Sequence, residues 1–380
     1  MKLLIISCSQ NAYHLSKKIE NCFAENSDYE IISAVKCKAL PEESFKEGLT
    51  EFVGEWFYRV DAVLFLCATG IAVRSIAPYI QHKGKDPAVL VMDEGGKFCI
   101  SLLSGHMGGA NALASEIAGL TGATPVITTA TDVEGKFSVD SFARSYHLSI
   151  ENWQLAKNIS AAILQGEKLS YISPLEQSGI KSGNEKEEAD LQRLSELLLT
   201  EAGECFAMDA SGEYNVSIDY EEKDIHHQNC LCLIPKVLVL GVGCKKNTPL
   251  EKIIDAVKKC FHVNHLYEEA ICQVASIDIK KEEAGIKEFC AAKNIPFVTF
   301  SSEELMAVEG TFSSSAFVSS VTGVDNVCER SAMAACKDAG GRLLVKKTAY
   351  DGVTISVARR YNEAWNAGNY LDKFKKFPRN

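Results

Sequence analysis

Three glycines and a histidine gather in one eight-residue segment, Ser104-Gly105-His106-Met107-Gly108-Gly109-Ala110-Asn111. Glycine lets the backbone turn sharply and approach a ligand, and histidine is the ordinary acid–base side chain near neutral pH. The apolar run 98–103 before the segment predicts a buried strand, and residues 111–120 after it predict a helix. Backbone N–H groups in such a loop favour an anionic or carbonyl-bearing ligand. The simpler alternative is a tight turn in which His106 only caps or packs.

Two more loops of the N-terminal region follow predicted strands. Thr69 and Gly70 precede a predicted helix over 71–80 that carries Arg74 in its first turn, and Thr128 to Asp132 ends another strand. Ligands of open α/β sheets lie beyond the carboxyl ends of the strands. We therefore expect Gly70 and Arg74 to face the His106 loop at one edge, which the segment 128–132 would close.

A second glycine turn is expected in the C-terminal region, at Gly241-Val242-Gly243-Cys244 between a strand over 236–240 and a helix over 250–260. The turn lacks the third glycine of a dinucleotide loop and the Gly-Lys-Ser/Thr of a Walker loop. Lys245 and Lys246 beside free N–H groups favour a carboxylate ligand, with Thr248 capping the helix. The alternative is a bare turn with two solvated lysines.

Hydroxyl residues precede a predicted helix over 316–321. Thr311 and Ser313 could hold carboxylate oxygens, although helix capping explains the same composition. Glu329 and Arg330 lie near the start of another predicted helix, over 327–339, and are expected to be solvated or paired rather than catalytic.

Fourteen cysteines raise the question of a metal centre, but no two form a Cys-x-x-Cys pair. Most lie in apolar patterns, as buried thiols of cytosolic proteins do. Cys230 and Cys232, with His226 and His227 nearby, come nearest to a zinc site, yet their spacing matches no zinc finger. We expect no metal site.

The alternation of strand and helix patterns predicts an α/β protein in three parts and a tail. Residues 1–135 form an N-terminal domain with an open α/β sheet, and Asp93-Glu94-Gly95-Gly96 predicts a hairpin that adds an antiparallel pair. Residues 136–235 form an acidic, poorly defined α+β middle domain, in which residues 178–190 are expected to be a linker or an exposed loop. Residues 236–360 form a compact C-terminal α/β domain, and the basic tail 361–380 is expected to be loosely held.

The composition of the chain argues against nucleic acid and membranes as partners. The net charge of −10 divides as −4 over residues 1–150, −10 over 151–235 and +4 over 236–380. No part combines dense basic residues with aromatics, so nucleic acid is not expected. The apolar runs are too short to cross a bilayer, so no membrane partner is expected. Met1 to Ser7 predicts a buried strand rather than a secretory leader, which favours a cytoplasmic protein.

Together these motifs resemble one known family. The segment Ser104 to Asn111, with Thr69-Gly70-Ile71-Ala72-Val73-Arg74, is similar to the N-terminal domain of the cobalamin-biosynthesis CbiG family. The matches to the family's C-terminal domain are Gly241 to Cys244, Thr311 to Ser315, the helix Val324 to Ala334, and Leu344-Val345-Lys346-Lys347. Where the family has Ala-Glu-x-Ala before its C-terminal helix, this chain has Cys328-Glu329-Arg330-Ser331.

The resemblance implies a hydrolase of the anaerobic vitamin B12 pathway that acts on cobalt-precorrin-5A. Water opens the δ-lactone of this substrate, the C20 carbon leaves with its methyl group as acetaldehyde, and cobalt-precorrin-5B is the product. The substrate brings its own cobalt, so no cofactor is expected. A homodimer is left open.

Lactone opening requires a base for water and a donor for the developing oxyanion. We assign the base to His106 and the donors to the N–H groups of Gly108 and Gly109. The residues expected to bind substrate are Ser104, Gly105, Gly108, Gly109, Asn111, Gly70, Arg74, Gly243, Cys244, Lys245, Thr311 and Ser313. The site lies either in the first domain or between the first and third.

Two other classes of function stay open. The chain could be a non-catalytic carrier of corrinoids or other tetrapyrroles, which would leave the lactone intact. It could also be a kinase or ligase that binds nucleotide at the two glycine loops, which a titration with ATP or NAD would test.

Overall fold

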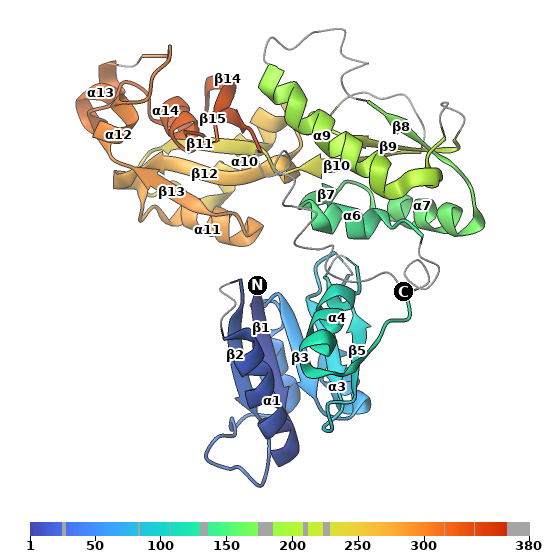
Figure 1. Ribbon diagram of the computed structural model, residues 1–380. Helices are drawn as coiled ribbons and strands as arrows, with labels where there is room; N and C mark the ends of the chain where they lie inside the picture. Colours follow the sequence, from blue (N-terminus) through green and yellow to red (C-terminus); the bar gives the residue numbers. More distant parts are fainter. Residues whose placement is uncertain are drawn as a thin grey trace. The chain divides into compact units, whose positions relative to one another are not determined.

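The computed structural model describes residues 1–24, 28–82, 84–106, 108–129, 136–173, 185–207, 212–222, 229–314, 316–337 and 339–362. The chain divides into two compact units (Figure 1). The first comprises residues 1–145 with 160–166, and the second comprises 146–159 with 167–380. The predicted domain boundaries stay predictions.

The first unit is built on six strands, each formed by an apolar run or a short extended segment. The strands are β1 (Lys2–Ser7), β2 (Glu30–Val35), β3 (Ala62–Leu66), β4 (Ala88–Met92), β5 (Phe98–Leu103) and β6 (Thr124–Val126). Every residue of β3 and β4 is buried, as in parallel strands covered on both faces. The helices of this unit are α1 (Gln10–Phe23), α2 (Leu49–Trp56), α3 (Thr69–Ile76), α4 (Ala110–Thr121) and α6 (Val139–Ser145).

The strand order is β2-β1-β3-β4-β5-β6, and the first four strands are parallel. The predicted hairpin is confirmed: β5 runs antiparallel to β4, with Val89 opposite Leu103 and Met92 opposite Cys99. Strand β6 is parallel to β5. The carboxyl ends of β5 and β6 therefore lie at the same edge as the amino ends of β1 to β4. The predicted α/β class is confirmed.

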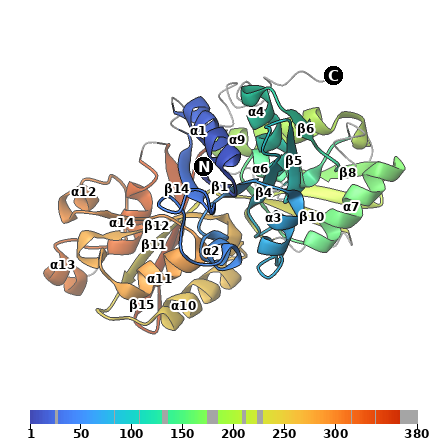
Figure 2. The same cartoon turned by 90° about the horizontal axis from the view of Figure 1, so that it is seen from below.

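Helices cover both faces of this sheet. Figure 2 shows α1 and α4 on one side of the strands and α2 and α3 on the other. The core under α1 and α4 includes Ile19 and Ile117, and the core on the other face includes Phe57 and Ile76. Helix α4 ends at Gly122 in the left-handed conformation, the usual end signal that glycine provides.

The second unit begins with a four-stranded sheet in the order β7-β10-β9-β8. Its strands are β7 (Leu148–Ile150), β8 (Leu169–Ile172), β9 (Tyr214–Ile218) and β10 (Cys230–Pro235), and the neighbouring helices are α7 (Trp153–Gln165), which crosses the division between the units, and α9 (Glu185–Ala202). The predicted linker over 178–190 is wrong for its described part, because residues 185–190 begin α9. Residues 178–184 lie outside the described residues. The polar start of α9 hid its apolar face, which begins at Leu191.

A five-stranded sheet completes the second unit, in the order β13-β12-β11-β15-β14. The strands are β11 (Leu238–Cys244), β12 (Ile271–Ile277), β13 (Phe297–Phe300), β14 (Gly341–Tyr350) and β15 (Val353–Arg360). The helices are α10 (Leu250–Val263), α11 (Ala284–Lys293), α12 (Ser302–Met306), α13 (Ala316–Thr322) and α14 (Val327–Ala334). Figure 1 shows α14 and α11 on opposite faces of this sheet.

A buried ion pair joins helix α9 to strand β15. Arg359 on β15 is fully buried and bonds both carboxylate oxygens of Asp190 on α9, at 2.6 and 2.9 Å. The N–H of Asn362 donates to the same carboxylate, and Tyr361 is buried. The tail predicted to be loosely held from Tyr361 is therefore held at its first two residues. No helix in the described part of the chain has both the length and the apolar character to span a bilayer.

Candidate functional site

The His106 loop leaves β5 and folds back onto the first turn of α4. The Gly109 N–H donates to the His106 carbonyl at 2.9 Å, and the Asn111 N–H donates to the Gly105 carbonyl at 3.1 Å. Ser104 and Gly109 both have positive φ, at 57° and 84°. Glycine adopts this conformation freely, whereas serine does so at a cost, so Ser104 carries backbone strain.

His106 is half-buried and is paired with a serine from a distant helix. Its Nδ1 lies 2.5 Å from Oγ of Ser141 on α6. If Nδ1 carries the proton and donates it to Ser141, the ring's lone pair is on Nε2, which is the form that can accept a proton from water. Ser141 thus orients the ring, as the third member of a catalytic triad orients its histidine.

Asn111 holds the loop together. It is buried, accepts a hydrogen bond from Ser101 at 2.6 Å and donates to Thr129 at 3.1 Å. A Cβ at Gly105 would lie 2.7 Å from the Asn111 Oδ1. Glycine at 105 is therefore explained by close packing, and Asn111 acts as a brace between β5, α4 and the end of β6.

Two polar groups of the loop are unused. The buried hydroxyl of Ser104 has no hydrogen-bond partner, and the Gly108 N–H has no acceptor among the described residues. The prediction that the Gly109 N–H stabilises an oxyanion is wrong, because that N–H already closes the turn to His106. Gly108 stays the candidate donor.

Sequence reasoning missed Arg144, which lies against the start of α4. A Cβ at Gly109 would lie 1.8 Å from the Arg144 guanidinium, so only glycine leaves room for this side chain. Burial lowers the pKa of Arg144, while the charges of Tyr29 and Asp61 act in the opposite direction. Ser141 and Arg144 are three residues apart on one helix face, and no local sequence signal connects them with the loop.

Gly70 and Arg74 lie elsewhere. They follow β3, whose last residue Leu66 pairs with Met92, and Met92 pairs with Cys99 at the start of β5. The expectation that they face the His106 loop is wrong, because the hairpin reverses β5 and places its carboxyl end at the opposite edge. Whether they bind substrate stays a prediction. Of the segment 128–132, Thr129 lies beside Asn111, and residues 130–132 lie outside the described residues.

A pair of thiols occupies the edge where Gly70 lies. Cys8 follows β1 and Cys67 follows β3, directly after the paired residues Ser7 and Leu66. A hydrogen bond from Cys67 lowers the pKa of the Cys8 thiol, whereas the same bond and burial raise the pKa of Cys67. Among the described residues, no group of three or more His, Cys, Asp or Glu could hold a metal ion, and His226 and His227 lie outside them.

The predicted glycine turn of the C-terminal region is wrong. Gly241 to Cys244 belong to β11, which pairs with β15 as far as Cys244 opposite Val353. A Cβ at Gly241 would lie 1.9 Å from the Cys328 carbonyl, so this glycine serves the close approach of α14. Thr248 does not cap α10 but donates to the Lys245 carbonyl. Lys245 and Lys246 are exposed beyond the strand.

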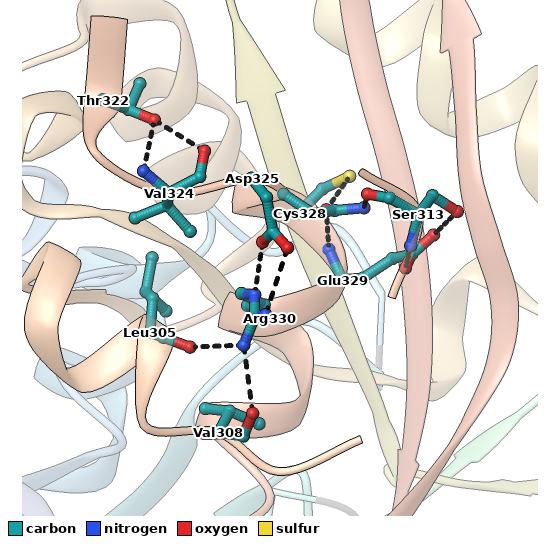
Figure 3. Close-up of polar contacts among 10 residues, drawn as sticks. Leu305, Val308, Ser313, Thr322, Val324, Asp325, Cys328, Glu329 and Arg330 are labelled. Atoms are coloured by element: carbon teal, nitrogen blue, oxygen red, sulfur yellow. Dashed lines mark hydrogen bonds and ion pairs between the residues drawn. The ribbon is translucent and has the colours of Figure 1, made fainter. Parts of the chain in front are cut away.

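Ser313 is held by a buried carboxylate. Glu329 is fully buried and accepts hydrogen bonds from the Ser313 N–H and hydroxyl, each at 2.8 Å (Figure 3). It also accepts from the Lys347 N–H at 2.6 Å. Asn326 caps α14 and also donates to the Ser313 carbonyl. The Ser313 hydroxyl proton therefore serves the fold, whereas Thr311 is exposed.

Arg330 is paired, as expected, but is not solvated. It bonds both oxygens of Asp325 and the carbonyls of Leu305 and Val308 (Figure 3). This pairing lowers the pKa of Asp325. Arg330 and Glu329 together fix the segment 305–313 on α14.

Two family models match the chain: "Cobalamin synthesis G N-terminal" over residues 51–132 and "Cobalamin synthesis G C-terminus" over 238–358. The chain is 33% identical to a "Cobalt-precorrin-5A hydrolase" from Salmonella typhimurium, over 82% of this chain and 86% of that protein. It is 28% identical to a protein of the same name from Priestia megaterium, over 93% of this chain and 94% of that protein. A solved structure of a putative cobalamin biosynthesis protein G homolog from Sulfolobus solfataricus matches at 23% identity with a TM-score of 0.40, over 95% and 97%.

Proposed function

Because this chain belongs to the cobalamin synthesis G family, we propose that it is a cobalt-precorrin-5A hydrolase of cobalamin biosynthesis. Support comes from the relatives of that name, which align over most of the chain. The single structural observation that carries the chemistry is the His106–Ser141 hydrogen bond, since it provides an oriented imidazole beside a glycine loop.

In the proposed first step, His106 takes a proton from water, which attacks the lactone carbonyl. The carbonyl oxygen becomes an oxyanion, and the N–H of Gly108 is the donor we assign to it. Collapse of this intermediate breaks the ester C–O bond. The products of this step are a carboxylate and an alcohol oxygen on C20, which takes up the proton.

In the proposed second step, His106 removes the proton from that C20 hydroxyl. The C20–O bond becomes the carbonyl of acetaldehyde, and the carbon–carbon bond to the macrocycle breaks. Its electron pair passes into the macrocycle, which takes up a proton. One base can serve both steps because each begins with removal of a proton from oxygen.

Precorrins carry carboxylate side chains, which positively charged side chains attract. Whether the exposed Lys245 binds substrate stays a prediction. No cofactor is proposed, because the cobalt ion arrives with the substrate.

The test is incubation of the protein with cobalt-precorrin-5A, followed by mass spectrometry of the macrocycle and trapping of the volatile product with a hydrazine. We expect loss of a two-carbon unit from the macrocycle and recovery of the hydrazone of acetaldehyde. Tight binding with an intact lactone would contradict the proposal and favour a tetrapyrrole carrier.

A further inference from the structure

Arg144 carries a guanidinium that forms no direct ion pair among the described residues, although the charges of Tyr29 and Asp61 act on it. Its half-buried guanidinium makes no hydrogen bond or ion pair in the described ranges. The two groups whose charges act on it have other direct partners: Asp61 accepts from the Lys2 N–H at 2.7 Å, and the Tyr29 hydroxyl donates to Glu116. A cation withdrawn from water normally gains an anionic partner in return. The guanidinium is therefore equipped for an anion that comes from outside the chain.

The surroundings of Arg144 suit an anion. Gly109 has no side chain, so the guanidinium lies directly against the start of α4, whose twelve residues carry the positive end of the helix dipole there. Ser104 packs closely against Gly108 in the same loop, and its buried hydroxyl has no partner. Each of these groups stabilises a bound anion, and none of them is itself negatively charged.

The same helix face carries Ser141, which orients His106. Arg144 is about one helical turn from Ser141, so an anion bound by Arg144 would lie by the helix face that contacts the proposed base. The planar fork of a guanidinium matches the two oxygens of a carboxylate, which a lysine cannot match.

We infer that Arg144 is a substrate-binding residue that takes a peripheral carboxylate of the macrocycle and sets the register of the lactone against His106. The choice of a carboxylate rests on the proposed function, because precorrins carry such groups. The site itself rests only on the unpaired guanidinium and its position.

The test measures binding separately from turnover. Quenching of protein fluorescence is titrated with uroporphyrin, a macrocycle whose peripheral groups are all carboxylic acids, and inorganic phosphate is added as a competitor. Arg144→Gln should raise the Kd for uroporphyrin about 10- to 100-fold, and Arg144→Lys should recover only part of this loss. The control is Arg193→Gln, which removes the same charge from a half-buried position on α9, where Arg193 pairs with Glu196.

An equal Kd for Arg144→Gln and Arg193→Gln would overturn the inference. If Arg144→Gln does not fold, Arg144→Lys tests the inference instead. A Kd equal to that of the wild type in Arg144→Lys would exclude a role for the guanidinium fork. If inorganic phosphate binds the wild-type site more tightly than uroporphyrin does, and so displaces it, the site belongs to phosphate and the inference is overturned. With cobalt-precorrin-5A, Arg144→Gln should raise KM more than it lowers kcat. If the wild type binds uroporphyrin through Arg144 but never releases acetaldehyde, the proposed function fails and the carboxylate site stands.

Discussion

The imidazole of His106 and the hydroxyl of Ser141 lie 2.5 Å apart, although 35 residues separate them in the sequence. His106 belongs to a loop that follows β5, and Ser141 belongs to α6. The contact converts a flexible side chain in a glycine loop into an oriented one. Orientation of a base within hydrogen-bond reach of the reacting atom is a large part of its catalytic effect.

Replacement of His106 tests the proposed base. His106→Ala should keep the fold and the binding of substrate but lower the rate of acetaldehyde release by about 100- to 10,000-fold, because general base catalysis contributes that much. The measurement is single-turnover release at saturating protein. His106→Gln, which keeps a polar side chain beside Ser141, is the control for packing. Near-normal release by either variant would remove His106 from the mechanism.

Ser141 is predicted to be a positioning residue. Ser141→Ala should lower kcat about 10-fold while KM stays within a factor of two or so, because only the ring orientation is lost. Ser141→Thr keeps the hydroxyl and should restore the wild-type kcat. An unchanged kcat in Ser141→Ala would assign the serine to packing alone.

Glu329 should contribute strongly to stability. Its carboxylate accepts from three donors in a fully buried position, and Glu329→Gln turns one acceptor oxygen into a donor that faces other donors. We expect a loss of about 2–4 kcal/mol in the free energy of unfolding, measured in urea. Ser313→Ala, which removes one hydroxyl donor, should cost about 1 kcal/mol. Equal, small losses would show that water replaces these bonds.

Two glycines form a matched pair for backbone substitution. Gly241→Ala places a Cβ 1.9 Å from the Cys328 carbonyl and should cost roughly 3 kcal/mol, because α14 must shift. Gly119 lies exposed on α4 with nothing within 4 Å of its Cβ position, so Gly119→Ala should stabilise by roughly 0.5–1 kcal/mol. The midpoints of urea unfolding test both predictions. A Gly241→Ala variant as stable as the wild type would contradict the tight contact between β11 and α14.

Cys8 should be unusually reactive. Since the Cys67 hydrogen bond lowers its pKa, the thiolate of Cys8 forms as pH rises through a value below the ordinary range of about 8.5. Its alkylation by iodoacetamide should therefore reach full rate at a lower pH than in Cys67→Ala. The measurement follows the tryptic peptide 3–17 by mass spectrometry. Identical pH–rate curves in the two proteins would show that the two thiols are not coupled.

Local patterns in the sequence determined much of the secondary structure and the fold class of this protein. The apolar runs of β1, β3 and β4 and the Asp93 to Gly96 turn predict an open α/β sheet with one hairpin, and the structure confirms both. The glycine loop around His106 is likewise visible without a structure, because sharp turns are encoded by neighbouring residues.

Tertiary structure alone decided which residues meet. Arg74 and His106 both follow strands, yet they lie at opposite ends of the strands, because β5 runs antiparallel to β4. The hairpin signal contained that reversal, whereas nothing local connects Ser141 or Arg144 with the loop. Gly241 looks like a turn residue until β15 pairs with it, and Glu329 looks solvated until Ser313 and Lys347 cover it. Sequence patterns report periodicity and chain direction over a few residues, but contacts between distant segments depend on how whole elements pack.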